Sequence, residues 1–152
     1  CFDALRYPTV VSDVIAVHRR GAPIHQNKQI FEHVTRTINI NPGRRVRAYD
    51  IAVAGFNNSI TDGVDAVARS EHPDAVYEDT HAWIFFPPSF ELLMLELYML
   101  GYTRLRAVKV SPTYGNQFGV VLKPDERYPV PPVEIMDELE KERLRLTKKA
   151  RH

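Results

Sequence analysis

Apolar side chains recur three and four residues apart in several stretches of the chain, a spacing that aligns them on one face of an α-helix. Hydroxyl residues that can cap a helix precede some of these stretches, and Gly21 and Gly101 follow two of them, where glycine suits the left-handed end of a helix. The pattern predicts helices at about Val10–Arg19, Ile24–Ile38, Ser59–Glu71 and Ser89–Leu100.

Two of these helices carry their apolar residues on a defined side. In the second helix the apolar face is Ile30, Phe31, Val34 and Ile38, and His33 neighbours that face. In the third helix the residues that share one side are Ile60, Val64, Val67 and Ala68. The stretch between these two helices, RRVRAYDIAVAGFNNS, alternates only weakly, and we interpret it as irregular.

The last third of the chain changes from helical to extended patterning and back. Leu105–Val110 and Gln117–Lys123 read as strands, and the intervening SPTYGN contains turn residues, so the two are expected to pair as an antiparallel hairpin. A proline-stiffened linker follows. The final helix is acidic first and basic last, which complements the helix dipole. Its narrow apolar seam comprises Ile135, Met136, Leu139 and Leu146, and such a charged helix is usually a solvated flank or a contact to another subunit.

Composition limits the function classes. A chain of 152 residues with a net charge of +1 is expected to form one domain and shows no basic excess of the kind that nucleic-acid binders carry. The longest apolar run, Leu92–Leu100, contains Glu96 and is too short to span a bilayer. The single cysteine, Cys1, excludes an intrachain disulfide and fits a reducing, cytoplasmic compartment. Because the sequence starts at Cys1 without methionine, we expect a piece of a longer protein.

The stretch from Tyr77 to Leu100 is the best candidate for a functional site. It places Asp79 and His81 in an alternating run with the only tryptophan, Trp83, directly before the most apolar helical segment. A short strand or extended run that delivers an acid and an imidazole to the start of a buried helix can build a site. The alternative is that the aromatic residues are core and His81 bonds a buried carbonyl.

The sequence lacks the motifs of several common kinds of functional site. The sequence contains no GxGxxG or Walker loop, no CxxC or HExxH zinc pattern and no GxSxG nucleophile turn. What remains is a set of histidines and acids: His18, His33, His81, Asp3, Asp13 and Asp79. If the imidazoles converge, one of them can act as a general base or the group can bind a metal, although we expect no metal site. Arg6 can bind an anionic group or form a structural ion pair.

Three phrases together resemble a known family. They are Phe2-Asp3 with Arg6-Tyr7-Pro8-Thr9 and Ala16-Val17-His18, then the block Asp79–Phe90, then Gly115-Asn116-Gln117-Phe118. The set is similar to a group of bacterial class I S-adenosylmethionine-dependent methyltransferase-domain proteins that often accompany glycosyltransferases in cell-surface polysaccharide pathways. Phe86 stands where the family has threonine, and Gln117 stands where it has glutamate.

The resemblance covers Cys1 to about Lys123 and implies the C-terminal part of an α/β methyltransferase fold, a fragment that would itself look α+β. Residues 1–80 would form a mostly helical substrate-side segment, residues 81–123 the last helix and terminal β-hairpin, and residues 124–152 a linker and charged helix. The half that binds S-adenosylmethionine, with its glycine-rich loop, would precede Cys1.

The resemblance also implies roles for individual residues. The base would be His81 oriented by Asp79, with His18 as the next choice. Arg6 would bind an anionic group of the acceptor, and the acceptor side would further include Asp3, His33 and Trp83. The implied function is acceptor binding for methyl transfer to a sugar or small metabolite, with a small-molecule or glycan acceptor as partner. A non-catalytic methyltransferase-like binding or assembly module, with a homo-oligomer or a partner chain, and a histidine-based metal-dependent hydrolase stay open as alternatives.

Overall fold

The computed structural model describes residues 6–21, 25, 27–38, 55–77, 79–114, 117–126 and 133–151. These residues form an α+β arrangement of helices with a small antiparallel sheet. The chain divides into two compact units, Cys1–Tyr7 with Ala16–Ile84 and Pro8–Ile15 with Phe85–His152. Helix α1 (Val11–Arg20) begins in the residues of the second unit and continues into those of the first. Most of the stretch predicted to be irregular, residues 44–59, lies outside the described residues.

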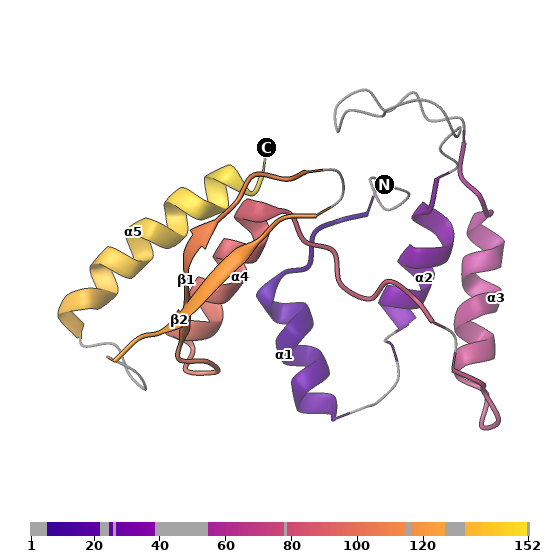
Figure 1. Ribbon diagram of the computed structural model, residues 1–152. Helices are drawn as coiled ribbons and strands as arrows, with labels where there is room; N and C mark the ends of the chain where they lie inside the picture. Colours follow the sequence, from indigo (N-terminus) through magenta and orange to yellow (C-terminus); the bar gives the residue numbers. More distant parts are fainter. Residues whose placement is uncertain are drawn as a thin grey trace. The chain divides into compact units, whose positions relative to one another are not determined.

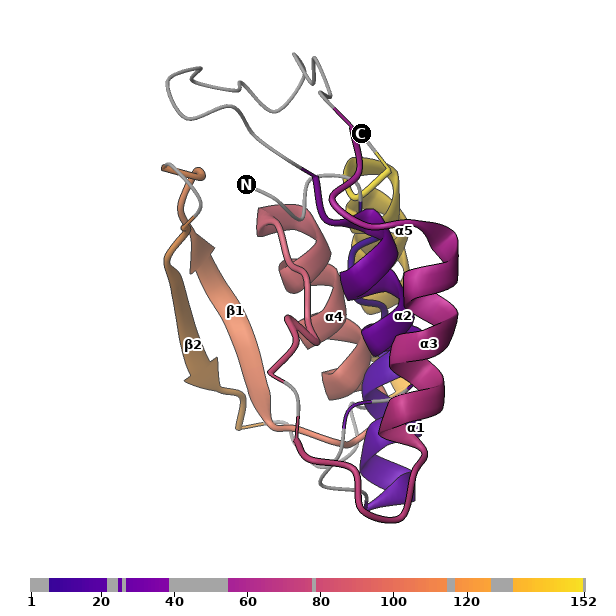
Figure 2. The same cartoon turned by 90° about the vertical axis from the view of Figure 1, so that its right-hand side faces the viewer.

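The first unit is built on two helices that pack side by side, α2 (Asn27–Arg36) and α3 (Ile60–Ser70). Figure 2 shows them next to each other, and contacts at both ends show that they run antiparallel. At one end the amide N–H of Asn57 donates to the carbonyl of Thr37 at 3.0 Å, and at the other Asn27 bonds Glu71. Helix α2 buries Ile30, as its pattern predicts, together with Gln29 and Thr35. Ile38 is also buried but lies beyond the helix, which ends two residues earlier.

Helix α3 packs through its small residues rather than through its apolar side. Gly63 and Ala66 are buried, whereas Ile60 and Val64 keep 66% and 57% of their surface exposed. A Cβ atom built on Gly63 would lie 2.3 Å from Cγ2 of Thr35 and 3.0 Å from the ring of Phe31. The two helices therefore approach so closely that only glycine fits at this position, and Ile60 and Val64 of the predicted apolar side face solvent.

Of the two residues that can start α3, Ser59 and Thr61, the structure has Ser59 as the N-cap. The Ser59 hydroxyl accepts a hydrogen bond from the amide N–H of Asp62 at 3.2 Å, and the Asp62 carboxylate accepts one from the amide N–H of Ser59 at 2.7 Å. This reciprocal arrangement satisfies two amide groups that the first turn of a helix leaves without partners. The hydrogen bonds from Ser59 also hold the pKa of the Asp62 carboxyl below its usual value.

The second unit contains the predicted hairpin. Strands β1 (Leu105–Val110) and β2 (Val120–Pro124) pair antiparallel, with Leu105 opposite Pro124 and Val110 opposite Val120. The register shifts between Ala107 and Lys109, which leaves Val108 as an extra residue in β1. The first strand matches its predicted bounds, and the second begins three residues later than predicted. Among the described residues the sheet consists of these two strands.

Helices α4 (Pro87–Met99) and α5 (Val133–Lys149) form the core of the second unit and α4 also packs on β1 (Figure 1). Four buried residues meet between the helices: Leu95, Tyr98, Leu139 and Leu146. The apolar seam predicted for α5 is thus its packing face, and this helix is part of the core rather than a solvated flank. Glu96 of α4 accepts a hydrogen bond from Arg143 at 2.9 Å, which raises the pKa of the Arg143 guanidinium.

Ser89, which the sequence suggests as the cap of α4, is not its N-cap, because the helix begins about one turn earlier. The N-cap is Phe86, and Pro87 occupies the first turn, where its missing N–H costs no helical hydrogen bond. Ser89 lies inside that turn, and its hydroxyl accepts a hydrogen bond from the amide N–H of Phe86 at 3.0 Å. The serine therefore stabilises the helix start from within, because the two prolines allow the helix to begin before it.

Replacing Gly63 with alanine is expected to destabilise the first unit. Helix propensity alone favours alanine by about 1 kcal/mol, but the new methyl group would collide with Thr35, whose rotamer is held by a 2.7 Å bond to the carbonyl of Phe31. We expect overpacking to outweigh propensity, with a net loss of about 1–2 kcal/mol in urea unfolding. The control is Val64→Ala on the exposed side of the same helix, and equal stability of the two variants would contradict the close approach.

Truncation of Leu146 tests the role of α5. Leu146 has no exposed surface and packs in the core, so Leu146→Ala should lower the free energy of unfolding by about 2–5 kcal/mol. The matched control is Leu144→Ala, two residues away and 57% exposed, which should change stability by no more than about 0.5 kcal/mol. If both substitutions had the same small effect on thermal or urea unfolding, α5 would not be part of the core.

Candidate functional site

An extended segment, residues 79–84, carries the predicted site residues. It has no regular strand pairing, yet its side chains alternate as in a strand. Thr80 is buried and Ala82 and Ile84 are half-buried, whereas Asp79, His81 and Trp83 are exposed. The extended run predicted before α4 is therefore present, and it presents the acid, the imidazole and the indole on its solvent side.

The backbone of this segment is held from two directions. The guanidinium of Arg6 donates a hydrogen bond to the carbonyl oxygen of His81, and the side-chain amide of Gln29 donates to the carbonyl of Ala82 at 3.4 Å. Both donors are buried, with 7% of their surface exposed. Because both donors are buried, water competes little for these bonds, which hold the main chain at His81 to Arg6 and at Ala82 to Gln29 of α2.

The segment and α2 bring two histidines together. The amide N–H of His81 donates to Nδ1 of His33 at 3.4 Å, and the two imidazole rings lie 5.5 Å apart with an angle of 57° between their planes. Because Nδ1 of His33 accepts, a neutral His33 carries its proton on Nε2. The pair thus joins an imidazole on the last turns of a helix to one on an extended, exposed segment.

A small polar hollow of about 420 Å³ lies beside the histidine pair. Its wall is formed by His33, Val34, Thr37, Asn58, Asp79 and Thr80. The amide of Asn58 donates to the carbonyl of Val34 at 3.1 Å, which fixes one side of the wall. The hydroxyl oxygen of Thr80 is buried and has no hydrogen-bond partner within the described part of the chain.

The predicted site residues do not all meet. His33 and Asp79 line the hollow, and His81 packs against His33. No hydrogen bond or ion pair joins Asp79 to His81 among the described residues, so the orienting role expected for this acid is not formed in the structure.

The remaining predicted residues lie elsewhere or serve another purpose. His18 is exposed in the last turn of α1, and Trp83 is exposed two residues after His81; neither lines the hollow. Arg6, expected to bind an anionic group or to form an ion pair, donates a hydrogen bond to the main chain at His81. Asp3 lies outside the described residues.

Sequence reasoning missed four residues of this site. Thr37, Asn58 and Thr80 line the hollow, and Gln29 anchors the segment. The alternation of residues 79–84 carries a signal for Thr80, since it places this residue on the face opposite His81. Nothing local points to Gln29 or Asn58, because their positions depend on how α2, α3 and the segment pack.

The described residues contain no group of three or more histidine, cysteine, aspartate and glutamate side chains placed to hold a metal ion. In the same residues, no helix combines the length and the apolarity needed to cross a membrane. Comparison of the chain with protein-family models, curated proteins and solved structures gave no match. What the site can do therefore follows from its own geometry: a pair of imidazoles, one of them exposed, beside a polar hollow with an acid on its wall.

Removal of Arg6 tests the anchoring of the segment. Arg6→Ala deletes the buried donor to the His81 carbonyl, and we expect a loss of about 1–3 kcal/mol in local stability. Amide hydrogen exchange at residues 80–83 should accelerate, while exchange in α3 should stay close to that of the parent chain. Arg19→Ala, at an exposed position of α1, is the control. Unchanged exchange at residues 80–83 in Arg6→Ala would show that the segment is held by other contacts.

Proposed function

We propose that the chain is the acceptor-binding part of an S-adenosylmethionine-dependent methyltransferase that acts on a sugar or small metabolite. The observation that carries the proposal is the His33–His81 pair beside the polar hollow of Asp79 and Thr80. Methyl transfer to a hydroxyl or amine needs an acceptor held in line and often a base that takes its proton. The hollow suits a small polar acceptor, and imidazole is the side chain most often used as the base.

His81 is the residue we assign as the base. Its ring is exposed, while its N–H and C=O groups are both engaged, by His33 and Arg6 respectively. A base on a fixed backbone keeps its position relative to a bound acceptor, which is what proximity catalysis requires. Asp79 lines the hollow and would contact the acceptor rather than orient the imidazole.

The cofactor would be bound mainly by residues outside this sequence, which contains no glycine-rich phosphate or nucleotide loop. The sheet supports this part of the proposal. Strands β1 and β2 pair only with each other within the described residues, and an uncovered pair of strand edges is normally completed by neighbouring strands or covered. Two strands at the end of a larger sheet would have this appearance.

One observation favours a second function, a non-catalytic binding module. Arg6 and Gln29 both donate to main-chain carbonyl groups. Such hydrogen bonds hold a segment in place and take no part in a reaction. In that case the hollow would bind a glycan or small molecule without converting it.

The two functions are separated by activity measurements on the full-length protein encoded by the gene. We expect calorimetry to detect binding of S-adenosylmethionine to the full-length protein, and weak or no binding to the 152-residue chain. We expect His81→Gln to lower methyl transfer at least about a hundredfold without changing cofactor affinity, since general-base catalysis contributes about 10²–10⁴-fold. Asp65→Asn, at an exposed position of α3, is the control.

Two outcomes would contradict the methyltransferase proposal. Absence of cofactor binding by the full-length protein would reject it outright. Full activity of His81→Gln would remove His81 as the base. Loss of glycan binding in Asp79→Asn, with no cofactor binding at all, would instead support the binding module.

A further inference from the structure

A second and larger hollow lies at the opposite end of the α2–α3 pair. Its volume is about 1020 Å³, at the upper end of the roughly 300–1,000 Å³ typical of small-molecule sites. The wall combines the end of α3, the start of α2 and the segment that follows α3, and its main residues are His25, Ile30, Ala68, Arg69, Val76 and Tyr77. None of the residues that line it belongs to the hollow beside His33.

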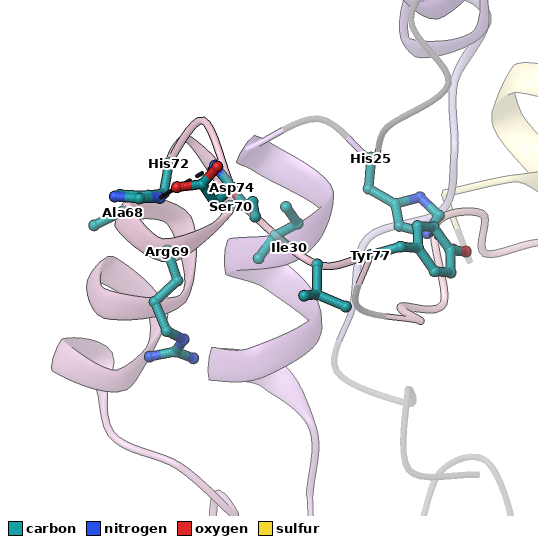
Figure 3. Close-up of a pocket in the computed structure, with 10 residues that line it drawn as sticks. His25, Ile30, Ala68, Arg69, Ser70, His72, Asp74 and Tyr77 are labelled. Carbon is teal, nitrogen blue, oxygen red and sulfur yellow. Dashed lines mark hydrogen bonds and ion pairs between the residues drawn. The ribbon is translucent and has the colours of Figure 1, made fainter.

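One end of this hollow is aromatic. The rings of His25 and Tyr77 lie 5.3 Å apart at an angle of 37°, and Nε2 of His25 is 3.0 Å from the hydroxyl oxygen of Tyr77. The hydrogen bond holds the two rings in a fixed mutual orientation, although they come from segments about fifty residues apart. Figure 3 shows them on one side of Ile30, facing the hollow. The exposed face of the Tyr77 ring is available for another ring to stack on.

The middle of the hollow is apolar. Ile30 forms its floor and is 3% exposed, and Ala68 and Ala75 add small side chains. Val76 keeps 86% of its surface and Tyr77 61% in contact with solvent. Covering that apolar surface with a ligand would release about 25 cal/mol for each Å² removed from water, a driving force that a purely polar ligand would not use.

The other end carries charge. Figure 3 shows Arg69 across Ile30 from the His25–Tyr77 pair. The wall also includes Asp74, but its carboxylate lies 3.9 Å from Nδ1 of His72, and the amide N–H of Asp74 donates to the same nitrogen at 3.2 Å. Because Nδ1 of His72 accepts from that amide, it does not donate to the carboxylate, whose charge is instead screened by solvent, since the Asp74 side chain is 92% exposed. The guanidinium of Arg69 is the group of this wall that suits an anionic part of a ligand.

We infer that this hollow binds a small ring-bearing molecule with one acidic group. The ring packs on Tyr77 and His25 over Ile30 and Val76, and the carboxylate or phosphate is directed toward Arg69. The inference does not depend on methyl transfer, because it uses neither the histidine pair nor the cofactor. A mostly apolar pocket with a few convergent polar groups is the form that small-molecule sites usually take.

The test uses two probes of similar shape and different charge, 4-hydroxyphenylacetate and 4-ethylphenol, titrated into the ¹⁵N-labelled chain. We expect amide signals of Ala68, Ala75, Val76 and Tyr77 to shift with a dissociation constant on the order of 1 mM for the acid, as suits a fragment of this size. The phenol should shift the same signals with weaker binding. No saturable shift at these residues up to about 10 mM of either probe would overturn the inference.

Two substitutions test the site, one at the residue that would bind the acidic group and one that fills the hollow. Arg69→Gln should weaken the acid roughly fivefold and leave the phenol unchanged, since the arginine is exposed and an exposed charge contributes modestly. Ala68→Trp should fill the hollow and weaken both probes at least about tenfold. Thr61→Ala, at an exposed position in the first turn of α3, is the control and should bind both probes as the parent does.

The outcomes remain decisive if one variant misfolds. Circular dichroism identifies an unfolded Ala68→Trp, and Ala75→Trp, on the exposed segment after α3, then fills the hollow instead. Retained binding in the folded tryptophan variant would overturn the inference. So would shifts that extend along Ile60 and Val64, because they would indicate a larger partner on the side of α3 rather than a small molecule in the hollow.

Discussion

The close approach of α3 to α2 at Gly63 is the contact on which the first unit depends. With no side chain at this position, Thr35 and Phe31 of α2 lie where a Cβ atom would otherwise be. The two helices meet through small residues, and a hollow lies at each end of the pair. One hollow lies where α2 ends and α3 begins, beside His33 and Asn58, and the other lies where α3 ends and α2 begins, beside Arg69 and His25. A single steric constraint thus positions both candidate sites.

The elements that were predictable are those with local signals. Ser59 with Asp62 forms a reciprocal cap, and the α5 seam of Leu139 and Leu146 packs as its spacing predicts. The hairpin follows from two β-rich runs around a turn. These features depend on residues within a few positions of one another, so hydrogen bonding and periodicity are visible in the sequence.

The elements that were not predictable depend on tertiary packing. Apolar residues on α3 suggest a packing side at Ile60 and Val64, yet the helix packs through Gly63 because α2 presents a surface that only a small residue can approach. Some residues of the candidate site could be predicted from the sequence and others could not. His33 and His81 were singled out from their residue type and position, and they do meet. The main-chain role of Arg6 could not be read from the sequence, because it joins residues seventy-five positions apart.

The core of the second unit has a consequence for the order in which this protein folds. Leu95 and Tyr98 lie on α4, but the residues that enclose them, Leu139 and Leu146, arrive more than forty positions later, after the hairpin. During synthesis α4 therefore emerges with its most apolar side chains unshielded, and contacts between distant residues close slowly because the intervening loop must first be ordered. The apolar side chains of α4 stay exposed in the nascent chain until α5 leaves the ribosome. A chaperone would be of most use during this interval.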